Sequence, residues 1–294
     1  MYINNHMVHQ NRIKAYILMT LLMLILGGIG SLLSNMFGWG FTGTSIFLLI
    51  GMGINLSAYF FSDSLILRTS HAKRLSREQA PEFFQMVEEM AANCQLPMPK
   101  LVFIDDPAMN AFAAGRNPSH SAIAVTRGLL EKLTFDEVKG VVAHEMAHIR
   151  NWDTLLMTVV SILAGFISIL ADSFWTSRVI SKAQDKDRTG VLAGVSLVLA
   201  IFAPLAAMFI QLAISRRREF LADETGALIA QSPSNLASAL DKISRDRRPL
   251  PGMNAATAHL YFSNPMKSEG LIERLFSTHP PIEERIGRLK RMSV

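Results

Sequence analysis

The chain has 294 residues, of which 50% are hydrophobic and 18% charged, and its mean hydropathy is +0.26. This balance is typical of a membrane protein. The formal net charge of +5 does not favour nucleic-acid binding, because the basic residues lie beside apolar segments and are not interleaved with aromatic ones. The single cysteine, Cys94, excludes an intramolecular disulfide and a zinc site built from paired cysteines.

Four uncharged stretches are candidates for membrane helices, which need about 20 apolar residues to cross the hydrocarbon core. They are residues 15–37, 38–62, 155–171 and 191–214. A cleaved signal peptide is the alternative for the first stretch, but a small-residue cleavage site does not follow it and a second apolar run does. We therefore expect a retained helical hairpin. Glycines 27, 28, 30, 51 and 53 would let its two helices approach closely.

Basic residues beside these stretches predict their orientation, because cytoplasmic loops are enriched in Lys and Arg. Arg12 and Lys14 precede the first stretch, four basic residues between 68 and 77 follow the second, and residues 216–218 follow the fourth. Both termini and the region after the second stretch are thus predicted to be cytoplasmic. Segment 172–190 has nearly balanced charges. The third and fourth stretches are therefore either a transmembrane hairpin or a pair lying against the membrane.

Residues 63–153, after the N-terminal hairpin of residues 1–62, are predicted to begin a cytoplasmic α+β domain. The pattern of PEFFQMVEEMAANC indicates an amphipathic helix. KLVFID, NAFAAG and SAIAVT are short runs bounded by turn residues, and GRNPSH between the last two predicts a β-hairpin. Thr134 and Glu137 form a capping-box pattern at the start of a further helix.

Residues 154–214 form the predicted second hydrophobic hairpin, and residues 215–294 the second part of the cytoplasmic domain. EFLADETGALIA and SPSNLASALDKIS are expected to be helical. RRPLPGMN is predicted to be a loop, because two prolines and a glycine lie close together. The chain should end in a basic helix after His279 and two prolines.

The sequence HEMAH places His144 and His148 one helical turn apart, so both imidazoles can bind one ion. Glu145 lies beside them, near enough to contact a metal-bound water. This HExxH pattern indicates zinc-dependent hydrolysis, in which the metal lowers the pKa of its water to about 7 and the glutamate takes the proton. Chance matches and two ordinary surface histidines are the alternative. We predict one zinc ion per chain.

A catalytic zinc of this kind needs a third protein ligand. The metzincin pattern fails, because Asn151 and Thr154 stand where it requires Gly and His. Glu219 is the predicted third ligand, the alternative being a glutamate that balances the neighbouring arginines. Asp223, one turn on, is expected to hydrogen-bond a ligand histidine and fix its tautomer, and Asn151 to support the ligands similarly.

Glu219 follows His148 by about 70 residues and two apolar stretches. It can reach the zinc only if the chain returns to the same side of the membrane. The number of crossings in between must therefore be even or zero.

The order of motifs resembles that of a known family. DPAMNAFAAGRNPSHSAIAVTRGLL, HEMAHIRNWD, SRRREFLADETGA and FSTHPPIEERI follow one another with the apolar segments between them. The chain resembles the integral-membrane zinc metalloproteases of the HtpX heat-shock type, which are related to the CAAX prenyl proteases. The resemblance implies a mainly α membrane protein with helical transmembrane hairpins and a cytoplasmic, gluzincin-like zinc protease domain.

The resemblance also implies roles that the residues alone do not. His279, by itself an ordinary turn histidine, would bind substrate or steady the oxyanion, with Arg285 as a nearby electrostatic partner. The NAFAAG strand would be an exposed edge on which an extended substrate lies, contacted by Asn110, Ala111, Phe112 and Ala113.

Such enzymes degrade misfolded or damaged membrane proteins in the bacterial inner membrane, alongside an ATP-dependent membrane protease. Lipid and unfolded proteins, and not nucleic acid, are therefore the expected partners of this chain.

Three other interpretations of these motifs compete with a cytoplasmic zinc protease. A zinc site deep in the bilayer is disfavoured, because Lys139, Arg150 and Asp153 flank the motif and charges at that depth are costly. A dedicated CAAX prenyl protease would need more membrane spans than this chain offers. A membrane scaffold with a vestigial or structural HExxH would bind zinc, if at all, without an open coordination position.

Overall fold

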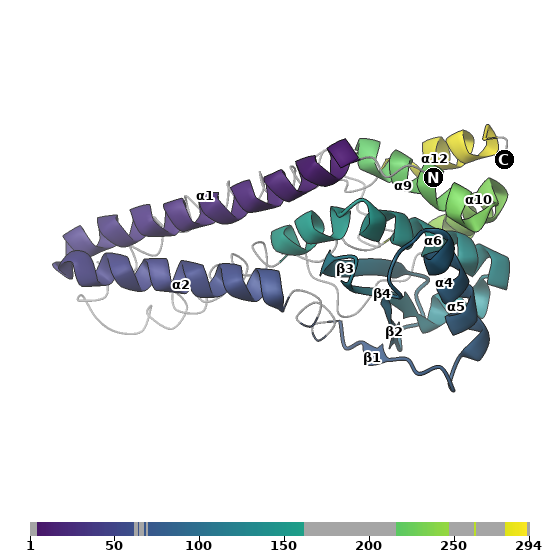
Figure 1. Ribbon diagram of the computed structural model, residues 1–294, viewed down its shortest axis with the longest axis horizontal. Helices are drawn as coiled ribbons and strands as arrows, with labels where there is room; N and C mark the ends of the chain where they lie inside the picture. Colours follow the sequence, from purple (N-terminus) through teal and green to yellow (C-terminus); the bar gives the residue numbers. More distant parts are fainter. Residues whose placement is uncertain are drawn as a thin grey trace, which may run out of the picture.

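The structure is a computed structural model that describes residues 5–61, 64, 68, 70–161, 216–246, 262 and 280–292. Helices α1 (Asn5–Phe37) and α2 (Gly40–Phe60) form a long hairpin that projects from an α+β domain (Figure 1). Helix α1 begins beside this domain and runs away from it to the tip of the hairpin. The described part of the chain therefore has the two regions that the sequence predicted, a helical hairpin and an α+β domain.

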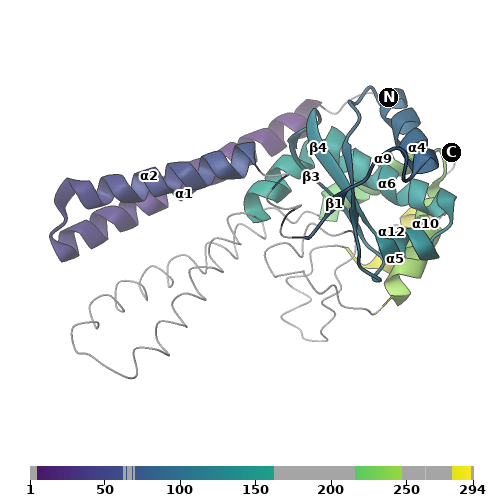
Figure 2. The same cartoon turned by 90° about the horizontal axis from the view of Figure 1, so that it is seen from below.

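The two helices of the hairpin lie side by side (Figures 1 and 2). The hairpin has apolar side chains on its outer surface. Leu24 is 68% exposed and Phe41 84%. By length and composition alone, Val8–Asn35 and Gly40–Ser57 could each span a membrane. They overlap the first two predicted stretches, residues 15–37 and 38–62. The third stretch is described only as far as residue 161, and the fourth lies outside the described residues.

Three of the five glycines face the partner helix as expected. A Cβ atom on Gly27, Gly30 or Gly51 would lie 2.6–2.9 Å from a side chain of the opposite helix. Gly28 and Gly53 have open space beside them, so they do not contribute to this close approach. At the tip, Gly38 and Gly40 have φ values of 67° and 59°, which residues with a Cβ rarely adopt.

The α+β domain has a sheet of four described strands in the order β1-β2-β4-β3. The strands are β1 (Lys73–Arg74), β2 (Lys100–Ile104), β3 (Ala111–Asn117) and β4 (His120–Thr126). β3 and β4 form the predicted antiparallel hairpin, and β2 runs parallel to β4. β1 and the short helix α5 (Arg127–Lys132), which Thr126 caps, were not predicted. The helices α4 (Pro81–Asn93) and α5 lie beside this sheet (Figure 2).

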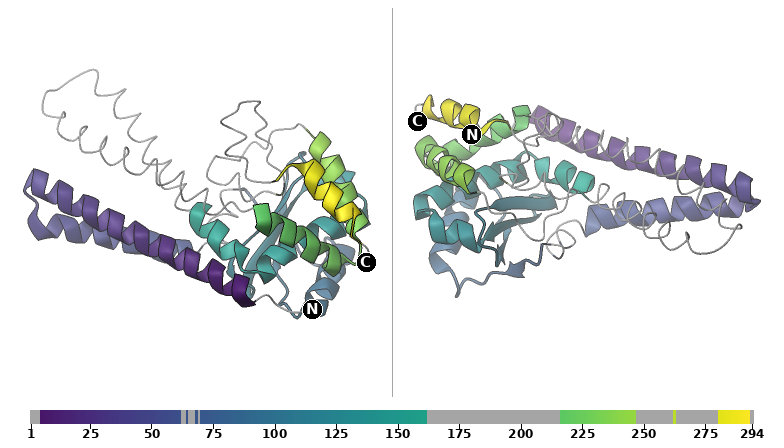
Figure 3. Two further views of the ribbon diagram at one scale, coloured as in Figure 1. Left: turned by 90° about the horizontal axis from the view of Figure 1, so that it is seen from above. Right: turned by 180° about the vertical axis from the view of Figure 1, so that it is seen from behind.

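Helix α6 (Phe135–Arg150) is almost entirely buried and carries the HExxH motif. Its capping box forms as predicted, with Thr134 and Glu137 each bonding the other's backbone. It packs against β3 on one side and helices α9 (Arg216–Ala230) and α10 (Pro233–Arg245) on another, and α12 (Ile282–Lys290) packs on α9 and α10 (Figure 3). The carboxylate of Glu137 also accepts hydrogen bonds from Ser238 (2.7 Å) and Lys242 (2.8 Å) of α10. α6 is thereby fixed between the sheet and the C-terminal helices.

A turn after α6 brings the chain back to the hairpin. Trp152 has a φ of 60°, which ends the helix, and residues 153–161 form a new helical segment. Leu155, Leu156 and Val159 of this segment pack against Leu18 and Leu22 of α1 in one buried apolar cluster. The hairpin and the α+β domain are therefore joined by a shared core next to the HExxH helix.

Candidate metal centre and active site

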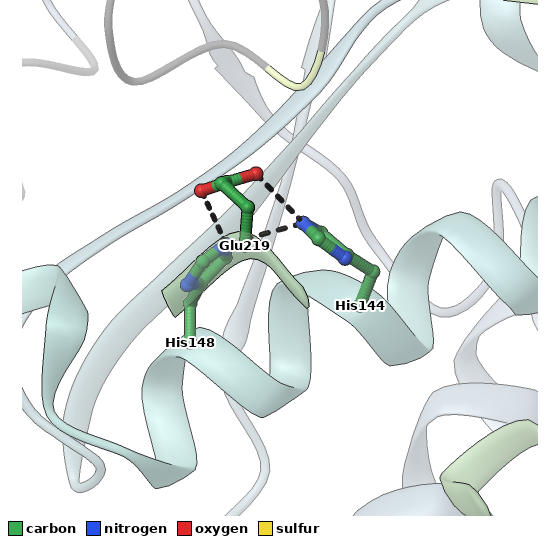
Figure 4. Close-up of side chains that lie close together, drawn as sticks. All are labelled: His144, His148 and Glu219. Carbon is green, nitrogen blue, oxygen red and sulfur yellow. Dashed lines mark hydrogen bonds and ion pairs between the residues drawn. The ribbon is translucent and has the colours of Figure 1, made fainter. Parts of the chain in front are cut away.

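His144 and His148 on α6 and Glu219 on α9 point toward one another in the interior of the α+β domain (Figure 4). The Nε2 atoms of the two histidines lie 3.1 Å apart. Glu219 places Oε2 3.8 Å from His144 Nε2 and Oε1 3.6 Å from His148 Nε2. All three side chains are buried. The structure thus brings together the three residues that the sequence predicted as ligands.

Carboxylates set the orientation of both imidazoles. His144 Nδ1 lies 2.9 Å from Asp223 Oδ1, and His148 Nδ1 lies 3.0 Å from Asp153 Oδ2. A carboxylate at Nδ1 favours the tautomer with hydrogen on that nitrogen, which leaves the Nε2 lone pair free to bind a metal. Both lone pairs therefore face the same point, together with the Glu219 carboxylate.

This donor set fits a zinc ion. Ligands bound at about 2.1 Å in a tetrahedron lie about 3.4 Å from one another, close to the three distances observed. With hydrogen on both Nδ1 atoms, two neutral imidazoles would place two Nε2 lone pairs 3.1 Å apart with no hydrogen between them, so the geometry favours either a proton or a metal cation at this point. Two imidazoles and one carboxylate are also the ligands of a common class of catalytic zinc site, which keeps its fourth position open.

Arg285 of α12 completes the support of this cluster. The buried guanidinium donates from Nε to Asp223 Oδ2 (2.8 Å) and from Nη2 to Asp223 Oδ1 (2.7 Å). Its Nη1 lies 3.8 Å from Glu219 Oε2. Burial would raise the pKa of Asp223, but the charge and hydrogen bonds of Arg285 outweigh it and hold the pKa below its ordinary value. Asp223 therefore stays ionised beside His144.

The two histidines differ in how readily they hold a proton in this geometry. Burial lowers the pKa of His144 to about 4, although Asp223 opposes this. Burial also disfavours charge on His148, but Asp153 and Glu219 outweigh it and raise its pKa to about 9. A metal must displace a proton from His148, since a ligand imidazole is neutral. The site therefore attracts positive charge.

Glu145 is buried next to the ligand histidines. Burial raises its pKa to about 7, although the charge of His148 opposes the shift. The backbone N–H of Ala113 on β3 donates a hydrogen bond to its carboxylate. A carboxyl group with a pKa near neutrality can both accept and release a proton, which a general acid–base residue must do.

β3 lies at the end of the described sheet, but it is not the exposed edge that the resemblance implied. Asn110, Ala111 and Ala113 are buried, because α6 covers one face of the strand. The backbone N–H of Phe262 donates to the carbonyl oxygen of Ala111 (2.8 Å) at the outer edge of the strand. Phe112 projects to the opposite face and packs in a cluster with Met157.

Phe262 also contacts the predicted metal ligands. Its ring meets the His144 ring edge-on, with centroids 5.0 Å apart, and the Arg285 guanidinium lies 5.0 Å from its centroid. Sequence reasoning missed this residue, because FSNP lies in a stretch without a helical or strand pattern. His279, which the resemblance suggested as a substrate-binding group, lies outside the described residues.

The turn after α6 contains Asn151, which was predicted to support the ligands, and Asp153, for which no role in the site was predicted. Asn151 contributes its backbone carbonyl, which accepts a hydrogen bond from Asn11 Nδ2 (3.0 Å), while Asp153 contacts His148. Sequence reasoning missed Asp153 because five residues of straight helix would turn it away from His148. The left-handed conformation of Trp152 brings it back. The sequence signal that could have identified Asp153 is an acidic residue shortly after the end of the helix that carries the two histidines.

Comparisons with known proteins identify a peptidase family and relatives that are similar to this chain. The model of peptidase family M48 matches residues 77–293. A protease HtpX homolog of Pelotomaculum thermopropionicum is 43% identical over 97% of this chain and 100% of its own length. One of Pyrococcus furiosus is 44% identical over 96% of each chain. A crystal structure of Ste24p from S. mikatae is similar in fold, with a TM-score of 0.53 at 18% identity, over 97% of this chain and 67% of that one.

Gly226 offers a test of how closely α9 must approach α6. A Cβ atom there would lie 2.8 Å from both the backbone nitrogen and Cα of His144. Gly226→Ala should push α9, and Glu219 with it, away from the histidines and weaken zinc binding by about tenfold or more. The measurement is competition with a zinc chelator. Gly287→Ala in α12 is the control, because the nearest atom is a side-chain nitrogen 3.7 Å away. Equal zinc affinities of Gly226→Ala and the wild type would show that the site does not require this close packing.

Proposed function

This chain is a metallopeptidase that belongs to peptidase family M48, and we propose that it is a membrane-embedded zinc endopeptidase of the HtpX type. The buried cluster of His144, His148 and Glu219 carries this proposal, because both imidazoles have Nδ1 against a carboxylate and Nε2 toward a common point. Glu145 beside them supplies a proton acceptor. A protease acts on protein substrates, so the proposed reaction is the hydrolysis of peptide bonds.

When bound, zinc would lower the pKa of a coordinated water and polarise the carbonyl of the scissile peptide bond. His144, His148 and Glu219 are the residues that would hold it. Glu145 would take a proton from the attacking water and pass it to the leaving amine. Its burial keeps bulk water from competing for that proton, and the Ala113 N–H holds its carboxylate at the edge of β3.

The outer edge of β3 would bind the substrate backbone. Ala111 directs its carbonyl outward, where it accepts from Phe262. An extended peptide that added to this edge would use the same kind of main-chain hydrogen bond, which gives affinity with little sequence preference. We propose that Asn110, Ala111, Phe112 and Ala113 line this subsite, that a peptide displaces Phe262 from it, and that His279 assists substrate or oxyanion binding.

The proposed substrates are misfolded or damaged membrane proteins, cleaved on the cytoplasmic side of the bacterial inner membrane in quality control and stress. The exposed apolar hairpin supports membrane attachment, and the position of the ligands on α6 and α9 supports chemistry outside the bilayer. An ATP-dependent membrane protease is the proposed partner. Substrate capture by main-chain bonds favours broad specificity over a dedicated CAAX activity.

Glu145→Gln and Glu219→Ala separate chemistry from metal binding. Purified in detergent and assayed on an unfolded protein such as casein, Glu145→Gln should lose about a thousandfold of activity or more while keeping its zinc, since the ligand set is intact. Glu219→Ala should lose zinc as well as activity. Glu131→Gln, on the exposed surface of α5, is the control and should behave as wild type. Activity that survives Glu145→Gln, or that zinc removal leaves unchanged, refutes the proposed reaction.

The orientation can be tested with single cysteines in a Cys94→Ser chain expressed in bacterial cells. Trp39→Cys at the hairpin tip should react with a membrane-impermeant maleimide added to intact spheroplasts, because the hairpin crosses the membrane. Glu82→Cys on the exposed side of α4 should react only after the membrane is permeabilised. The reverse pattern would place the active site outside the cytoplasm. Protection of both positions in spheroplasts would show that the hairpin does not span.

A further inference from the structure

Asn11, near the start of α1, is buried against the turn that follows α6. It is only 3% exposed. Its Nδ2 donates to Asp153 Oδ1 (2.6 Å) and to the backbone carbonyl of Asn151 (3.0 Å). A primary amide nitrogen carries two hydrogens, so both donors of this group are used on one turn. The residues involved are 140 and 142 positions apart in the chain.

The next residue of α1 holds the middle of the same turn. The Arg12 guanidinium lies 5.1 Å from the ring centroid of Trp152. Trp152 has the left-handed backbone conformation, which a residue with a branched or bulky side chain adopts only when its surroundings hold it there. Two consecutive residues of the hairpin thus contact all three residues of the turn, from Asn151 to Asp153.

The turn matters because Asp153 is the partner of a predicted zinc ligand. Asp153 has no exposed surface, accepts from Asn11 on Oδ1 and contacts His148 Nδ1 through Oδ2 (3.0 Å). The two oxygens of one carboxylate therefore connect α1 to the ligand. Loss of the Asn11 donor would leave Oδ1 buried without that hydrogen bond, and a carboxylate that rotates to recover one would turn away from His148.

We propose that Asn11 is a positioning residue for the metal site. Through Asp153 it fixes the orientation of His148, so the N-terminal hairpin is a structural part of the zinc centre as well as a membrane anchor. This inference rests on the proposed zinc function of His144, His148 and Glu219. It makes zinc retention depend on a hydrogen bond from a helix that the sequence places in the membrane region.

The test measures zinc release from the full-length, zinc-loaded protein into an excess of chelator. Asn11→Leu keeps the approximate size of the side chain and removes the donor. It should release zinc about tenfold faster or more, as expected for the loss of an interaction that orients a ligand. Asn55→Leu is the matched control. Asn55 is also buried in the hairpin, but its Nδ2 donates to the backbone carbonyl of Met19 (3.0 Å) and not to the turn. This variant should release zinc at the wild-type rate.

An exchange of the two side chains provides a second measurement, independent of how well Asn11→Leu folds. Asp153→Asn alone should release zinc faster, since the single amide oxygen cannot accept from both Asn11 Nδ2 and His148 Nδ1. Asn11→Asp combined with Asp153→Asn gives the new amide hydrogens an acceptor on α1, so the amide oxygen can face His148 Nδ1, and it should slow the release again. Wild-type release from Asn11→Leu, or equal release from the single and double variants, overturns the proposal. A wild-type chain that retains no zinc would instead refute the proposed function itself.

Discussion

The contacts between the two α6 histidines and their carboxylates connect α6 to helices from distant parts of the chain. His144 Nδ1 faces Asp223 and His148 Nδ1 faces Asp153, and each carboxylate is held in turn by a residue from another part of the chain. Arg285 of α12 fixes Asp223, and Asn11 of α1 donates to Asp153. Helices α1, α6 and α12 therefore meet at one cluster, although they lie far apart in the sequence.

Burial shifts the pKa values of the groups in this cluster, and it also makes their charges costly in free energy. Four carboxylates, those of Glu145, Asp153, Glu219 and Asp223, lie buried around two imidazoles. Buried charges are tolerated only when paired or bound to a metal. Arg285 pairs with Asp223, and the pKa of His148, raised to about 9, shows how strongly the remaining acids attract positive charge. A divalent cation between the Nε2 atoms would supply this positive charge, while Glu145 stays free for proton transfer.

Local sequence patterns predicted the helices and strands that carry the motifs. Residues that support the site through long-range contacts could not be predicted in this way. Helical spacing brings His144 and His148 together, and the capping box marks the start of α6, because both depend on residues within one or two turns. Glu219 could be predicted because a zinc site needs a third ligand and the chain must return. Asp153 and Asn11 depend on the conformation of Trp152 and on packing between residues about 140 apart, which no periodicity encodes. Phe262 lies in a stretch without a helical or strand pattern, so nothing local predicted its backbone contact with β3 or its ring contact with His144.

X-ray absorption at the zinc edge of the purified full-length protein can test the proposed ligand set, because it reads the ligand atoms themselves. A site of His144, His148 and Glu219 should show about two imidazole nitrogens at 2.0–2.1 Å together with oxygen from a carboxylate and water, in a four- or five-coordinate site. A sulfur shell at about 2.3 Å would contradict it, because Cys94 would then be a ligand. A site of oxygen ligands alone would contradict it as well, since His144 and His148 would not bind the metal.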